Sequence, residues 1–170
     1  MIDNAIKNAK NSQNTEALFE VRAPGRAAII VEVIGNNEGH CETKLASILK
    51  KNGGVIEKNL LNMFERKGVI VLKNDNETSL DQVEDDAIEF GAEDVEEEPK
   101  CFTLTCSPLE FPDVLEKFKE KYEILYSQID YVPNMYVEMP NIRDKAFLKA
   151  LLVALENSEH VTGVYHNASF

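Results

Sequence analysis

The residues best suited to chemistry in this sequence are Lys and Arg side chains near the ends of predicted elements. Such side chains neutralise phosphate groups, which supply most of the affinity of proteins for nucleic acid. Arg22 and Arg26 flank a predicted tight turn, and Lys50 and Lys51 end a predicted helix. This basic rim predicts contact with RNA, and the simpler alternative is scattered charge on the surface of a small domain. The full set is Arg22, Arg26, Lys44, Lys50, Lys51, Lys58, Arg66 and Lys67.

No catalytic pattern accompanies these residues. The histidines His40, His160 and His166 lack H-E-x-x-H spacing, and no P-loop, G-x-S-x-G or G-x-G-x-x-G motif is present. His40-Cys41 offers two metal ligands, but no second pair stands at zinc-site spacing. Nothing pairs a nucleophile with a base. We therefore expect a non-enzymatic protein with no cofactor, no metal and no small-molecule substrate.

Two further motifs have simpler structural explanations. Gly53-Gly54 resembles a phosphate-binding loop, but it follows a predicted helix end, whereas phosphates bind where a helix begins. The acidic run Glu93–Glu98 lacks the spacing of a calcium loop, so we expect a solvated hairpin connection. Such a charged surface repels phosphate, so we expect nucleic acid to bind only to a domain that lacks this acidic run.

Composition limits the class of protein. The chain has 170 residues, of which 44% are hydrophobic, too many for a disordered chain. The longest apolar run, Ala27–Val31, is far shorter than the ~20 residues that cross a bilayer, so no membrane contact is expected. Three cysteines without close pairing favour reduced thiols inside a cell.

The charge is unevenly distributed. The formal net charge of -12 by itself argues against nucleic acid. However, residues 1–73 contain 11 basic and 8 acidic side chains, residues 74–131 contain 4 and 18, and residues 132–170 contain 3 and 4. We interpret residues 74–131 as an acidic domain inserted into a split domain made of residues 17–73 and 132–170. Residues 1–16 precede the split domain.

The split domain has a mixed α+β pattern. Pro and Gly between two apolar runs predict a tight hairpin, and Gly53 predicts the stop of a helix. A second hairpin is predicted to turn at Lys67-Gly68. The predicted elements are strands Ala17–Arg22 and Ala27–Ile34, a helix over Cys41–Lys51, strands Leu60–Arg66 and Gly68–Leu72, a strand through Met135–Met139, a helix capped by Asn141 and a strand Val161–Tyr165.

The acidic segment has a pattern of its own. Helical spacing from Leu80 to Phe90, alternation over Cys101–Cys106 and a strand over Ile124–Tyr131 are evident. Ser107 followed by Pro108 predicts the start of another helix. With a first strand shared from residues 69–72, the order is β-α-β-β-α-β, which is the pattern of ferredoxin-like domains.

Five strings in the sequence are specific enough to compare with known families. They are Ala23-Pro24-Gly25-Arg26, Lys51-Asn52-Gly53-Gly54-Val55, Phe64–Val71, Glu89–Val95 and Val161–Asn167. These strings occur in the same order in the YebC/PmpR family, and the chain resembles that family over nearly its whole length. The family usually has Gly-Pro-Gly-Gly where this chain has the first string, so Arg26 adds a charge at the turn.

The resemblance implies a regulator rather than an enzyme. Mitochondrial members are translational activators of cytochrome c oxidase subunit I, and bacterial members are transcriptional regulators or ribosome-associated factors. His40-Cys41 and Cys106 look more like the animal mitochondrial branch. Asp3–Lys7 resembles the end of the family's N-terminal helical domain. The resemblance therefore implies that residues 1–16 are a remnant of that domain and that the chain is a fragment or a shortened member.

Three functional hypotheses follow. The first is a mitochondrial translational activator that binds messenger RNA, the mitochondrial ribosome or both through the basic rim. The second is a DNA-binding transcriptional regulator, for which a cytoplasmic location is expected. The third is a module whose acidic domain docks a basic protein, such as a ribosomal protein, without touching nucleic acid.

Overall fold

The computed structural model describes residues 15–170, so the predicted remnant domain at residues 1–16 lies almost entirely outside the described residues. The fold is α+β, as predicted. Contacts divide it into two units, which are residues 15–65 with Val132–Phe170, and Arg66–Tyr131. Among the described residues, every helix is too short or too polar to span a bilayer. That the units fold as separate domains stays a prediction.

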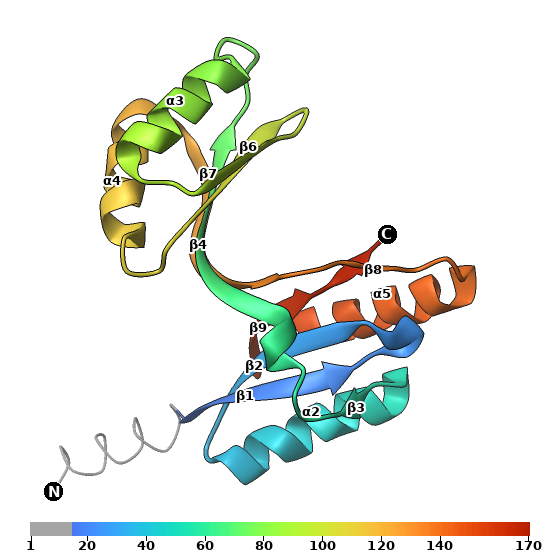
Figure 1. Cartoon of the computed structure of the whole chain (residues 1–170). Helices are drawn as coiled ribbons and strands as arrows, with labels where there is room; N and C mark the ends of the chain where they lie inside the picture. Colours follow the sequence, from blue (N-terminus) through green and yellow to red (C-terminus); the bar gives the residue numbers. More distant parts are fainter. Residues whose placement is uncertain (1–14) are drawn as a thin grey trace, which may run out of the picture. The chain divides into compact units, whose positions relative to one another are not determined.

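The first unit is built on a four-stranded sheet with strand order β3-β1-β2-β9 (Figure 1). Residues on one face of β1 and β2, such as Val21 and Ile29, pack with α2 and α5 into one core. The elements are β1 (Thr15–Arg22), η1 (Pro24–Arg26), β2 (Ala28–Gly35), α2 (Glu38–Asn52), β3 (Val55–Ile56), η2 (Leu61–Met63), β8 (Val137–Glu138), α5 (Ile142–Glu156), β9 (Val161–His166) and β10 (Ala168–Ser169).

Local signals in this unit are confirmed. β1 and β2 form the predicted antiparallel hairpin, and β2 is a central strand whose first four residues are buried. α2 ends where Gly53 adopts a φ of 80°. α5 begins at Asn141, whose side chain accepts a hydrogen bond from the N–H of Arg143. These features depend on a few neighbouring residues, which explains why the sequence reveals them.

The second unit is a four-stranded antiparallel sheet with strand order β5-β6-β4-β7, the order of ferredoxin-like domains. Its core includes Ile70, Phe102, Val114 and Phe118. β6 alternates as predicted, with Cys106 buried and Cys101 half-buried on the opposite face. The elements are β4 (Phe64–Lys73), α3 (Leu80–Phe90), β5 (Asp94–Glu97), β6 (Cys101–Cys106), α4 (Phe111–Lys121) and β7 (Ile124–Pro133).

The predicted hairpin at Lys67-Gly68 is wrong. Residues from Phe64 to Lys73 form one continuous strand, β4. A Cβ on Gly68 would lie 2.4 Å from Cδ2 of Phe111 and 2.8 Å from Sγ of Cys106. Glycine is therefore required here by close packing rather than by a turn. Because β4 is continuous, the second unit begins at Arg66, whereas the charge count placed its boundary at residue 74.

Two other local predictions also fail. α4 begins at Phe111 instead of Pro108, since Ser107 and Glu110 form a turn and Pro112 occupies the first turn of the helix. The acidic run is not merely a connection, because its residues Asp94–Glu97 form β5 and pair with β6. Carboxylates along an edge strand discourage pairing with other chains. Because these acidic residues replace the usual apolar ones, the sequence of β5 does not look like that of a strand.

Candidate nucleic-acid interface

The turn between β1 and β2 positions the first predicted contact residue. Gly25 and Arg26 have φ values of 76° and 67°, in the left-handed region. A Cβ on Gly25 would lie 2.3 Å from Cε of Met139, so only glycine lets the turn pack this closely. The N–H of Arg26 donates to the backbone oxygen of Ala23. The turn therefore defines the backbone position from which the exposed Arg26 side chain projects.

The end of α2 lies beside this turn. Lys50 and Lys51 are exposed in the last turn of the helix, where cations also interact favourably with the helix dipole. A Cβ on Gly53 would lie 3.8 Å from Cγ of Pro24, within ordinary van der Waals contact. The close approach brings both lysines to the same end of the first unit as Arg26.

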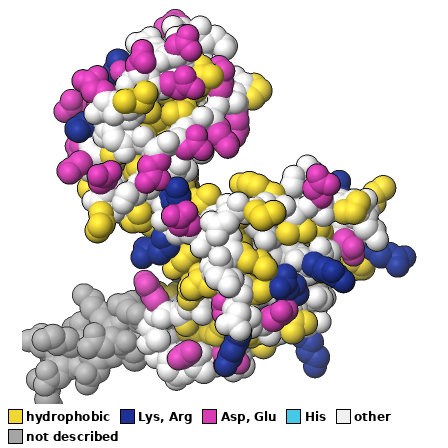
Figure 2. Space-filling model, viewed as in Figure 1, with side chains coloured by type: hydrophobic (Ala, Val, Ile, Leu, Met, Phe, Trp, Pro, Cys, Tyr) yellow, Lys and Arg dark blue, Asp and Glu magenta, His cyan; other side chains and the backbone are white. Residues whose placement is uncertain are grey.

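The same end includes a cation that the sequence prediction missed. α5 packs against η1, and Arg143 is exposed in the first turn of α5. A basic residue in the first turn of a helix interacts unfavourably with the helix dipole. This unusual placement is the feature of the sequence that could have marked Arg143 as a candidate contact residue. We call Arg26, Lys50, Lys51 and Arg143 the basic end. Figure 2 shows Lys and Arg side chains over this part of the first unit.

The remaining predicted residues of the first unit have other positions. Nε of Arg22 lies 3.1 Å from Oε2 of Glu57, and its Nη1 donates to the backbone oxygen of Arg26 at 2.9 Å. Arg22 therefore ties the turn to the segment after β3. Lys44 is exposed midway along α2, and Lys58 is exposed in the loop that follows β3.

Arg66 and Lys67 belong to the second unit, whereas the expected boundary at residue 74 assigned them to the split domain. Nζ of Lys67 lies 2.9 Å from Oε2 of Glu93. The Arg66 guanidinium lies 5.8 Å from the ring centroid of Tyr131. Both residues lie in the sheet of the second unit because β4 continues through them without a turn.

The revised boundary also changes the charge of the first unit. Residues 1–65 and 132–170 together contain 11 basic and 12 acidic side chains, so the first unit is nearly neutral instead of basic. Residues 66–131 contain 7 basic and 18 acidic side chains. Any attraction for phosphate must therefore come from the local arrangement of the basic end and not from the charge of the unit.

Comparison with known protein families identifies the family of the chain. The family model described as "TACO1/YebC second and third domain" matches residues 14–168. The chain belongs to the TACO1/YebC family. This agrees with the resemblance found in the sequence.

Bacterial proteins are among the TACO1/YebC relatives that the chain is similar to. A probable transcriptional regulatory protein of Caldicellulosiruptor bescii is 35% identical over 152 residues, which are 88% of this chain and 62% of the relative. One of Listeria monocytogenes is 31% identical, with 98% of this chain and 70% of the relative covered. The chain thus spans less than two thirds of the first relative. These names support the bacterial branch over the expected mitochondrial one.

A solved structure shows the same fold. The crystal structure of a conserved hypothetical protein from Aquifex aeolicus superposes with a TM-score of 0.83 at 28% sequence identity. The match covers 99% of this chain and 72% of the Aquifex chain. The architecture of both units therefore recurs in this Aquifex protein.

Proposed function

We propose that this protein regulates gene expression by contacting nucleic-acid phosphates through the basic end of its first unit. The supporting observation is the approach of Gly53 to Pro24, together with the packing of α5 on η1. Three segments distant in the sequence thereby present cations at one end of one unit. The mechanism is positioning of a nucleic acid, with no bond made or broken.

Duplex DNA is the first candidate for the nucleic acid. The relatives from Caldicellulosiruptor and Listeria are named probable transcriptional regulatory proteins, which supports a transcriptional role. A cytoplasmic location belongs to this proposal. Because the first unit is nearly neutral, binding is expected to depend on a few phosphate contacts, and its salt dependence should be correspondingly modest.

A mitochondrial translational activator is the second candidate. The motifs at His40-Cys41 and Cys106, which resemble the animal mitochondrial branch, favour it. In this case the basic end would contact messenger RNA or the mitochondrial ribosome, and the location would be mitochondrial. The two candidates share a surface and differ in the nucleic acid that the surface prefers.

The test measures binding of the full chain to labelled duplex DNA, to single-stranded RNA and to purified ribosomes across a salt series. Lys50→Glu with Lys51→Glu should weaken nucleic-acid binding strongly, and each neutralised contact should lower the salt slope by roughly 0.7–0.9. The matched control is Lys100→Glu with Lys117→Glu, which makes the same charge change at exposed sites of the second unit.

The outcomes separate the candidates. Preference for duplex DNA supports the transcriptional role, and preference for RNA or ribosomes supports the translational one. If the control pair weakens binding as much as the Lys50 and Lys51 pair does, the basic end is not the contact surface. The proposal then fails for both candidates.

A further inference from the structure

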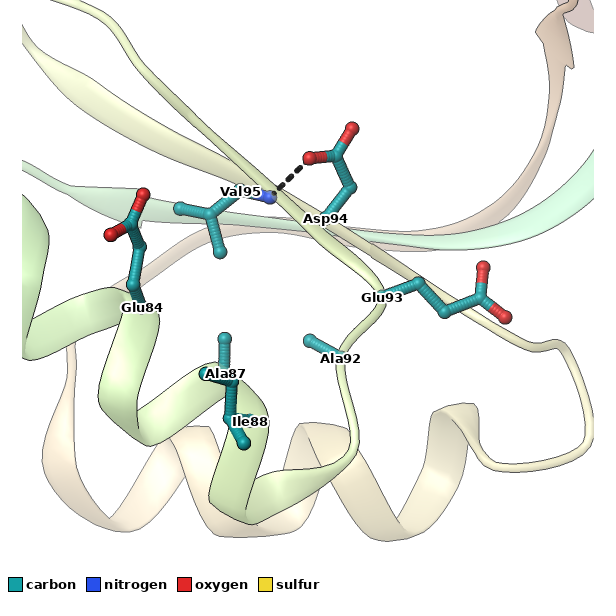
Figure 3. Close-up of a pocket in the computed structure, with 7 residues that line it drawn as sticks. All are labelled: Glu84, Ala87, Ile88, Ala92, Glu93, Asp94 and Val95. Carbon is teal, nitrogen blue, oxygen red and sulfur yellow. Dashed lines mark hydrogen bonds between the residues drawn. The ribbon is translucent and has the colours of Figure 1, made fainter.

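A hollow with an apolar floor lies between α3 and the edge strand β5 in the second unit (Figure 3). Ala87 and Ile88 come from α3, Ala92 from the loop, and Val95 from β5. Ile88 is 79% exposed, although an isoleucine is among the residues most often buried. The hollow measures about 220 Å³, which accommodates a few side chains rather than a folded domain.

One carboxylate stands directly beside this apolar floor. Figure 3 shows Glu84 next to the hollow, whereas the side chains of Glu93 and Asp94 point away from it. Glu84, Glu93 and Asp94 are all exposed. They belong to a unit that contains 18 acidic and 7 basic residues, and Figure 2 shows acidic side chains over much of its visible surface.

The backbone of β5 is partly closed to another strand. Glu98, which directly follows β5, and Cys101 of β6 exchange both backbone hydrogen bonds. In an antiparallel pair, successive residues of a strand direct their N–H groups alternately toward the partner strand and away from it. The N–H of Val95, three residues before Glu98, therefore points toward the open edge. Oδ1 of Asp94 accepts a hydrogen bond from that N–H at 2.9 Å. A partner is therefore expected to enter the hollow with side chains rather than to extend the sheet.

We infer that this hollow, lined by Glu84, Ile88, Glu93, Asp94 and Val95, binds a lysine- or arginine-rich protein segment that carries an apolar side chain. The apolar side chain of the segment covers Ile88 and Val95, and its cations pair with Glu84 and with other exposed carboxylates of this acidic unit. Charge complementarity decides the partner, since phosphate-bearing nucleic acid would be repelled from the same carboxylates. This surface lies on the second unit and is separate from the basic end.

The test uses the full chain and a labelled synthetic peptide of lysine and arginine residues with a leucine at its centre. Fluorescence anisotropy measures the dissociation constant. Ile88→Ser should weaken binding about tenfold, because it removes the apolar contact without a change of charge. Leu125→Ser is the matched control, since Leu125 is also exposed but lies on β7, and it should leave binding unchanged.

A second pair of variants tests the charge at the hollow. Glu84→Lys should also weaken the peptide about tenfold, whereas Glu120→Lys, the same change at an exposed position of α4, should have an effect below about twofold. Circular dichroism confirms folding of each variant. A peptide with serine in place of the leucine should bind the wild-type chain as weakly as the original peptide binds Ile88→Ser.

Several results would overturn the inference. Equal losses for Glu84→Lys and Glu120→Lys would indicate diffuse attraction with no defined site. Unchanged binding by Ile88→Ser would show that the peptide makes no apolar contact with Ile88. Sedimentation that shows a dimer lost in Ile88→Ser would make a second copy of this chain the occupant. The Lys50→Glu and Lys51→Glu variant should bind the peptide normally, so failure here is distinguishable from failure of the nucleic-acid proposal.

Discussion

Nζ of Lys121 lies 2.7 Å from Oδ2 of Asp86, and this ion pair joins the end of α4 to α3. Asp86 is only 7% exposed, and the hydroxyl of Tyr122 also donates a hydrogen bond to it. Burial by itself would raise the pKa of the Asp86 carboxyl, but the hydrogen bonds from Lys121 and Tyr122 outweigh burial and lower the pKa. The carboxylate therefore stays charged and clamps the two helices together.

Asp86→Asn should lower the free energy of unfolding by about 2 kcal/mol, because it weakens hydrogen bonds to a buried charged group. Urea denaturation measures the loss. Asp85→Asn changes the neighbouring exposed carboxylate on the same helix, and it should stay within about 0.5 kcal/mol of wild type. Equal losses in the two variants would show that the clamp contributes nothing specific.

The same carboxylate predicts a dependence of stability on pH. The pKa of Asp86 in the folded chain lies below the ordinary value of 3.8, so its contribution is present above that value and is lost as the pH falls through the folded pKa. The stability difference between wild type and Asp86→Asn should therefore be largest near neutral pH and narrow in acid. A difference that stays constant down to the acid unfolding of the chain would contradict this assignment.

Gly25→Ala should destabilise the first unit by about 1–3 kcal/mol. The new Cβ would lie 2.3 Å from Cε of Met139, and the residue must keep a φ of 76°. Gly39→Ala is the control, because Gly39 lies in α2, where the nearest atom to a Cβ is 3.4 Å away and alanine favours the helix. Thermal unfolding of both variants tests the difference, and a neutral Gly25→Ala would show that the turn can move away from Met139.

Much of the fold was predictable because its signals are local. The stop of α2 needs only Gly53 after two lysines, and the cap of α5 needs only Asn141 before an apolar stripe. The alternation of Cys101–Cys106 likewise reveals a strand with one buried face. Each signal depends on residues within one or two turns of chain.

The failures arose where distant residues decide the outcome. Gly68 looks like a turn residue until Phe111 and Cys106 are seen packed against it. For the candidate interface, the grouping of Arg26, Lys50 and Lys51 was foreseeable only in outline. Arg143 joins them because α5 packs on η1, a contact between segments more than a hundred residues apart that no local spacing encodes.

Cys106 should resist alkylation in the native protein. Burial raises the pKa of its thiol to about 11, and the charges of Glu93 and Glu110 add to the effect, so the reactive thiolate is scarce at about pH 8. Cys101 is half-buried, and burial and Glu98 raise the pKa of its thiol as well, but iodoacetamide should reach it first. Mass spectrometry of the labelled peptides checks the order, and labelling of Cys106 as fast as Cys101 would contradict it. In urea both residues should be labelled.

Arg26→Gly should separate stability from binding. Arg26 has a φ of 67°, a left-handed conformation that costs a residue with a Cβ about 1 kcal/mol, so glycine should raise the free energy of unfolding by up to that amount. The same change removes one cation of the basic end and should weaken nucleic-acid binding with a shallower salt slope. Arg26→Lys keeps both the strain and the charge, and it should resemble wild type in both measurements. A variant Arg26→Gly that binds as tightly as wild type would show that this side chain makes no phosphate contact.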